Sequence, residues 1–148
     1  MIQKIIDILQ EKGSPECLQK LKVLEWEIGK QNILHLRSLD LDEWDIISIS
    51  NVLQQDKTCN IRSISLSYNS NIWDAWIATF MKAIPESVSE IWLVGCGIGD
   101  IAGVAILDWM KQSANLQMIC MEQNNFSTDF QQGLYIFKKQ NPQIMVVT

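Results

Sequence analysis

The sequence predicts an α/β fold in which short strands alternate with helices along the chain. An apolar pattern typical of a strand followed by a turn recurs about every 28 residues, and each copy precedes a stretch with helical spacing. The chain has 148 residues, of which 47% are hydrophobic. It is therefore long enough to bury one core without disulfides or a structural metal.

The repeated pattern is apolar-x-x-apolar-x-apolar-x-x-(Asn or Cys). Its clearest copies begin at Ile61, Val88 and Leu116. The first apolar positions of the five copies are 36, 61, 88, 116 and 144, separated by 25, 27, 28 and 28 residues. This near-constant spacing predicts units that stack with their strands side by side.

Helical spacing follows each of the first four copies. Asp100 and Ser127 are expected N-caps, and Pro85 and Pro142 are expected after helix ends. The tryptophans outside the strands are expected to pack in or near the core, because large aromatic side chains mostly contribute by burial. The predicted helical stretches are 46–55, 73–84, 100–112 and 128–139, and these tryptophans are Trp26, Trp44, Trp73, Trp76 and Trp109.

These residues resemble the leucine-rich repeat family, in its ribonuclease-inhibitor-like form, over residues 32–148. The resemblance implies a short solenoid, a right-handed β-α superhelix with a parallel sheet on the concave side and helices on the convex side. It also implies that Asn69, Cys96 and Asn124 tie down the backbone of successive turns. Gly103 alone matches the family's helix glycine. The short, free-standing set of copies is also similar to leucine-rich repeat effectors that bacterial pathogens deliver into host cells.

Residues 1–31 do not follow the repeat. Their apolar spacing predicts two helices separated by the Gly13-Ser14-Pro15 break, which would form a helical N-terminal cap over the first of about four repeats in 32–148. The last copy, from Ile144, is a lone strand. Its outer edge would be bare, so self-association into a homodimer through this strand is an alternative role.

Alternation along the strands predicts which residues face outward. If positions 36, 39 and 41 and their equivalents point into the core, the N-terminal half of the concave face is small and acidic and its C-terminal half is apolar around Trp92. An exposed Trp beside Met and Val is a candidate binding anchor, although a shift of one residue would place Trp92 in the core. The predicted partner-binding residues are Trp92, Met118, Val94, Glu122, Asp40, Asp42, Tyr68 and Glu90.

Composition limits the classes of partner. The formal net charge is −5, and no apolar run reaches the roughly 18 residues of a membrane helix, so neither a nucleic-acid partner nor membrane insertion is expected. Four separated cysteines and one histidine do not form a zinc pattern and indicate a reducing compartment, the cytoplasm or the cytosol of a host cell. No metal or cofactor is expected: the glycines of 95–103 fit a tight turn, and the carboxylates of 40–45 fit a solvated acidic patch.

The sequence also contains one candidate catalytic arrangement. Cys59, His35 and Glu86 lie just before three successive predicted strands, in the order of a thiolate, a base and an orienting acid. Loop residues on the rim explain them better. The sequence therefore predicts a non-catalytic scaffold for protein–protein interaction, with a self-associating assembly protein and then a Cys59/His35 thiol hydrolase as alternatives.

Overall fold

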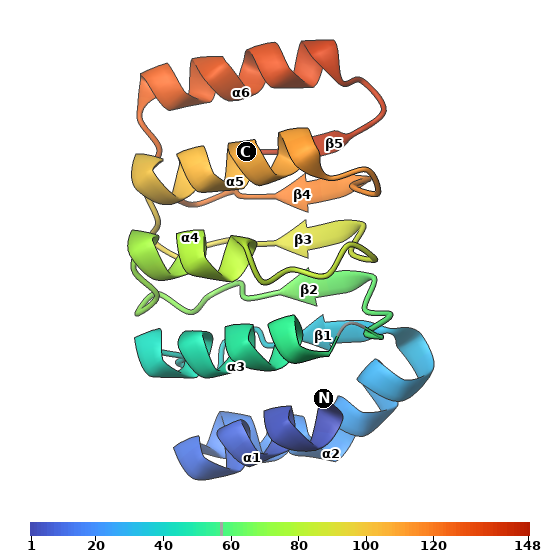
Figure 1. The fold of residues 1–148 in the computed structure, drawn as a ribbon. Coiled ribbons are helices and arrows are strands. Elements are labelled where there is room, and N and C mark those ends of the chain that lie inside the picture. Colours follow the sequence, from blue (N-terminus) through green and yellow to red (C-terminus); the bar gives the residue numbers. More distant parts are fainter. Residues whose placement is uncertain (57) are drawn as a thin grey trace.

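The protein is an α/β structure with one five-stranded parallel sheet and six α-helices, in a computed structural model that describes residues 1–56 and 58–148. The strands lie in the sheet in chain order, and each pairs in parallel with the next (Figure 1). The elements are α1 (Ile2–Lys12), α2 (Pro15–Trp26), the π-helix η1 (Glu27–Gln31), β1 (Ile33–His35), α3 (Glu43–Gln55), β2 (Ser63–Ser65), α4 (Asp74–Met81), β3 (Glu90–Trp92), α5 (Asp100–Gln112), β4 (Met118–Cys120), α6 (Thr128–Gln140) and β5 (Met145–Val147).

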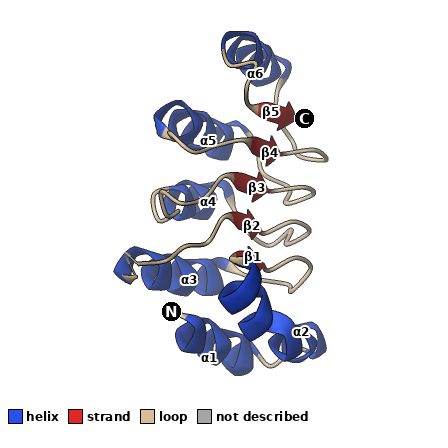
Figure 2. Ribbon diagram, turned by 90° about the vertical axis from the view of Figure 1, so that its right-hand side faces the viewer, coloured by secondary structure: helices blue, strands red, loops and turns tan. Residues whose placement is uncertain are grey.

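The core lies between the sheet and helices α3 to α6, which all cover the same side of the sheet (Figure 2). The middle residue of every strand points into this core, because side chains alternate between the two faces of a strand. None of these five side chains is more than 4% exposed. They are Leu34, Ile64, Ile91, Ile119 and Val146. The residues on either side of them form the open face of the sheet, opposite the helices.

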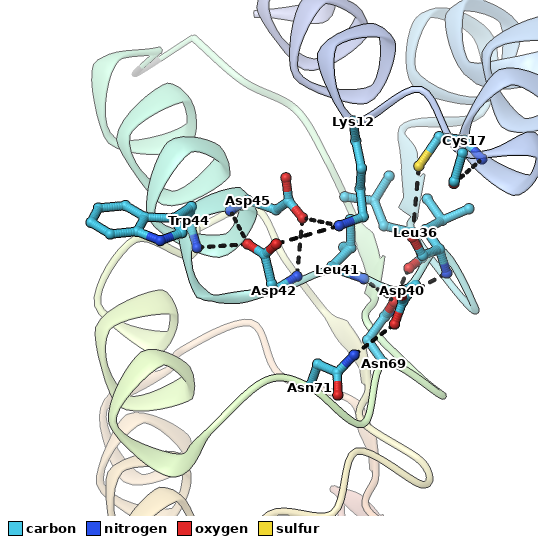
Figure 3. Close-up of polar contacts among 12 residues, drawn as sticks. Lys12, Cys17, Leu36, Asp40, Leu41, Asp42, Trp44, Asp45, Asn69 and Asn71 are labelled. Atoms are coloured by element: carbon cyan, nitrogen blue, oxygen red, sulfur yellow. Dashed lines mark hydrogen bonds and ion pairs between the residues drawn. The ribbon is translucent and has the colours of Figure 1, made fainter.

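Hydrogen bonds within the turns hold neighbouring strand–turn–helix units together. Buried Asn69 accepts from the backbone N–H groups of Leu39 and Leu41, at 3.0 Å each, and donates to the carbonyls of Leu36 and Leu66 at 2.8 and 2.7 Å (Figure 3). These bonds satisfy backbone groups that the turn would otherwise leave buried and unpaired.

The same arrangement recurs further along the sheet. Asn124 bridges to the turn of the preceding unit, accepting from Cys96 N at 3.0 Å and donating to the Leu93 carbonyl at 2.7 Å. The Cys96 thiol lies 3.4 Å from the Leu66 carbonyl. Asn69, Cys96 and Asn124 therefore occupy equivalent positions in three successive turns.

The helices begin close to where the sequence predicts. The expected bounds of α5 agree with the structure, whereas α3 begins three residues earlier than predicted, at Glu43, and α4 ends three residues early, at Met81. Ser127 caps α6 by accepting from Phe130 N at 3.2 Å, as predicted. The prediction of Asp100 as an N-cap is wrong. Gly99 holds that position, and the Asp74 carboxylate of the preceding helix accepts from Ala102 N in the first turn of α5 at 3.2 Å, as a capping side chain would.

Residues 1–31 cover the β1 end of the core. Ile5, Leu9 and Leu24 are fully buried there. Helix α1 lies below α3, and α2 with η1 crosses to the opposite side of the sheet before β1 begins (Figure 2). None of the helices in 1–56 and 58–148 is both long and apolar enough to cross a membrane.

The register of the first and last copies differs from the predicted one. Leu36 is equivalent to Leu66 rather than to Ile61, because β1 pairs Leu34 with Ile64. In the last copy Val146 pairs with Ile119, one residue away from the predicted alignment. Val146 is therefore in the core and Met145 is exposed. Both errors arise where the Asn or Cys that marks the turn is missing, so that apolar spacing alone set the alignment.

Candidate recognition site on the open face of the sheet

A hollow of about 560 Å³ lies on the open face, across the C-terminal ends of β1 to β4. Register explains its position, because residues paired in β1 to β4 place one side chain each on this face. Helix α2 adds one further side chain from the side. The lining residues are Lys20, His35, Arg37, Ser65, Ser67, Tyr68, Trp92, Val94, Cys120, Glu122 and Gln123.

The floor of the hollow is formed by small side chains on and just after β2. Ser65 and Ser67 line the hollow and Ser63 lies next to it on β2; all three are buried, although they point to the open face. They hydrogen-bond to their surroundings: Ser67 Oγ accepts from Val94 N at 3.1 Å, and Ser63 Oγ lies 2.9 Å from His35 Nε2. Small residues on β2 between larger ones on β1 and β3 therefore create the depression.

One wall carries cationic groups. Arg37 places its guanidinium 4.6 Å from the centre of the Tyr68 ring, a cation–π contact that fixes both side chains. Lys20 reaches the hollow from α2 and forms an ion pair with Glu27. Burial, and secondly the charge of Lys20, lower the pKa of His35, so this imidazole is neutral at pH 7.

The opposite wall is apolar with an acidic end. Trp92 is half-buried on the open face, so the slip that would place it in the core does not occur. Its indole Nε1 is buried and has no hydrogen-bond partner within the described residues. Val94, two residues after Trp92, also lines this wall. The Cys120 thiol lies 3.4 Å from the Glu122 carboxylate. Burial raises the pKa of Cys120, so the thiol stays protonated at neutral pH.

The remaining predicted partner-binding residues divide into two groups. Glu90 and Met118 pair on the open face, outside the hollow, at the N-terminal ends of β3 and β4. The placement of Asp40 and Asp42 on this face is wrong. Asp40 lies in the turn after β1 and accepts from Asn71 at 2.7 Å, and Asp42 is the N-cap of α3.

The consequence is a reversal of charge. The N-terminal part of the open face carries a guanidinium in place of two carboxylates, because the corrected register of β1 puts the neutral His35 and the charged Arg37 where Asp40 and Asp42 were expected. Sequence reasoning missed Lys20, His35 and Arg37 as parts of this site. One signal could have found the last two: Leu34, Leu36, Leu39 and Leu41 have the same spacing as Ile91, Leu93, Cys96 and Ile98.

The three candidate catalytic residues, Cys59, His35 and Glu86, do not lie together in one site. His35 lines the hollow on the open face, whereas Cys59 and Glu86 line a separate hollow at the N-terminal ends of the strands. Burial raises the pKa of the Cys59 thiol, and its contact is with Met1 Sδ at 3.3 Å. Across the described residues, no group of three or more His, Cys, Asp or Glu side chains is arranged to hold a metal ion.

Comparisons with protein-family models and with curated proteins found no match to this chain.

Proposed function

We propose that this protein is a leucine-rich-repeat-type solenoid that binds a partner protein through the open face of its sheet, without catalysis. Three features support this proposal. They are the repeat of about 28 residues, the chain-ordered parallel sheet with helices on one side, and the asparagine bonds between successive turns. In such a scaffold the sheet offers a broad surface on which side chains from different units converge.

The single observation that carries the proposal is the setting of Trp92. Its ring stands in a hollow between a cationic wall, formed by Lys20 and Arg37, and the Glu122 carboxylate. A half-buried Trp among mixed polar groups is typical of a binding hot spot, because a partner completes its burial and its polar neighbours set orientation. The hollow therefore suits a partner segment with an apolar side chain over Trp92 and an acidic group near Arg37.

Affinity capture with Trp92→Ala beside the wild type tests this role. The wild-type protein should retain a partner that the variant loses, and the purified partner should bind the variant at least about 30-fold more weakly by calorimetry. Truncating a half-buried Trp costs about 1–2 kcal/mol of unfolding free energy, so the variant remains folded. Trp26→Ala is the matched control, because Trp26 is an exposed tryptophan on α2 outside the hollow.

A charge substitution separates the hollow from the face as a whole. Arg37→Gln should weaken the same complex, whereas Lys30→Gln, a matched loss of charge on η1 outside the hollow, should not. A partner that binds wild type, Trp92→Ala and Arg37→Gln equally well would contradict recognition through this site. The partner we propose is a host-cell protein, following the resemblance to bacterial effectors.

A second candidate function is self-association through β5. Among the described residues β5 pairs only with β4, and Met145 on it is 63% exposed. An unpaired strand edge can add a strand from another copy. Light scattering over a range of concentrations distinguishes the two functions, because edge pairing raises the average mass with concentration and Met145→Lys should abolish that rise.

A further inference from the structure

A row of exposed apolar side chains runs along the edge where helices α3 to α5 begin. Trp44, Trp73 and Ile101 are 70%, 70% and 72% exposed. The sequence pattern predicts both tryptophans, and Trp26 on α2, as packing residues, and that prediction is wrong for all three. Trp44, Trp73 and Ile101 contribute little to the core, and three large apolar side chains exposed at successive helix starts are a candidate interaction surface.

Polar bonds join the neighbouring helix starts that carry these three residues. The Trp76 indole on α4 donates to Glu43 at the start of α3, at 3.2 Å. Asp74 at the start of α4 accepts from Gly99 N and Ala102 N at the start of α5, at 2.8 and 3.2 Å. Trp44 directly follows Glu43, Trp73 directly precedes Asp74, and Ile101 lies between Gly99 and Ala102. The three exposed side chains therefore lie beside contacts that join successive units.

The same edge is negatively charged. Six carboxylates lie on it or in the turns that lead to it, and they are Asp40, Asp42, Glu43, Asp45, Asp74 and Asp100. Hydrogen bonds with the start of α3 and with Lys12 lower the pKa of Asp42, and those with Ser127 lower the pKa of Asp100. Figure 3 shows Trp44 projecting away from α3 beside Asp42 and Asp45, with Lys12 reaching the two carboxylates from α1.

The edge where α3 to α5 begin carries an excess of negative charge. Each of the three helix N-termini supplies roughly half a positive charge, and Lys12 supplies one. Against six carboxylates this leaves the edge with between about three and four negative charges. Three lysines lie at the other edge, in the last turns of α5 and α6: Lys111, Lys138 and Lys139.

We propose that this acidic edge is a second interaction surface, separate from the open face, and that it binds a basic, extended segment of a partner protein. Arg and Lys side chains stack on exposed Trp rings by cation–π contact, and the surrounding carboxylates supply the longer-range attraction. Ile101 extends the row with an apolar contact for the aliphatic stems of the same side chains. The chemistry of the row thus selects Arg or Lys-rich sequence rather than an acidic or purely apolar one.

The test is a titration with a short peptide of alternating Arg and Ser, followed by the indole N–H signals of the six tryptophans. Signals are assigned by single Trp→Phe variants. The signals of Trp44 and Trp73 should move together, while that of Trp92 on the open face stays in place. The Trp44→Ser, Trp73→Ser double variant should bind about five- to thirty-fold more weakly, whereas Trp26→Ser should bind like wild type.

Two matched substitutions separate specific recognition from the general attraction of a basic peptide to an acidic protein. Asp40→Asn and Asp108→Asn each remove one negative charge, but Asp108 lies near the end of α5, away from the edge. Only Asp40→Asn should weaken binding. Raising NaCl from about 0.05 M to about 0.3 M should weaken wild-type binding and reduce this difference.

Three results would overturn the proposal. One is movement of the Trp92 signal instead of those of Trp44 and Trp73. Another is wild-type affinity in the double variant with unchanged circular dichroism. The third is concentration-dependent association of the protein alone that the double variant abolishes, because the row would then bind the lysine-bearing edge of a second copy. The second and third results do not involve the Trp92 site, so they are distinguishable from a failure of the proposed function.

Discussion

Replacement of Asn69 by Ala should destabilise the fold more than any other single polar substitution in the turns. The side chain is 0% exposed and makes four hydrogen bonds to backbone groups of two successive units. Each buried group left without a partner costs about 1–3 kcal/mol. Water can enter the space left by the side chain and bond to some of these groups, so we take the lower end of this cost, about 1 kcal/mol, for each of the four groups. The expected loss is therefore about 4 kcal/mol of unfolding free energy.

Urea denaturation followed by tryptophan fluorescence and by circular dichroism measures this loss. A domain of this size is stable by about 5–15 kcal/mol, so the variant should still fold but unfold at much lower urea. Amide hydrogen exchange adds a local readout: the N–H groups of Leu39 and Leu41 should lose protection first, because Asn69 is their acceptor.

Asn124→Ala is the matched control for this prediction. It removes the equivalent bonds two units further along, but Asn124 is half-buried and water can replace its bonds. The expected loss is about 1–2 kcal/mol. The reasoning fails if Asn69→Ala costs less than about 1 kcal/mol, or if the two substitutions cost the same.

Two further predictions concern packing and pH. Gly103→Ala should cost about 1–3 kcal/mol in urea denaturation, because an added Cβ would lie 2.6 Å from the Phe130 ring. Gly133→Ala, on α6 with no atom within 4 Å of an added Cβ, should leave stability equal or higher. For His35, whose pKa burial lowers in the folded state, the unfolded chain takes up a proton at the ordinary value of 6.5 while the folded protein does not. The free energy of unfolding should therefore be highest above pH 6.5 and fall as the pH drops below it. His35→Gln should remove this pH dependence. A variant that keeps the pH dependence of the wild type would contradict its attribution to His35.

Local sequence determined most of the fold. The 28-residue period, the alternation within strands and the helical spacing after each turn depend only on neighbours along the chain, and they gave the strands β2 to β4 with their core residues Ile64, Ile91 and Ile119. Trp92 and Val94 were placed on the open face for the same reason. Ser127 was recognisable as a cap because capping is a local hydrogen bond.

Tertiary structure alone decided the character of both surfaces. The register of β1 depends on its pairing with Ser63–Ser65, and the last copy depends on pairing with β4, so neither was fixed by its own apolar spacing. Lys20 joins the hollow from α2, which lies outside the repeat, so no spacing within residues 32–148 encodes its place there. The exposure of Trp44 and Trp73 was also decided by the tertiary structure, because burial is a property of packed elements and not of residue type.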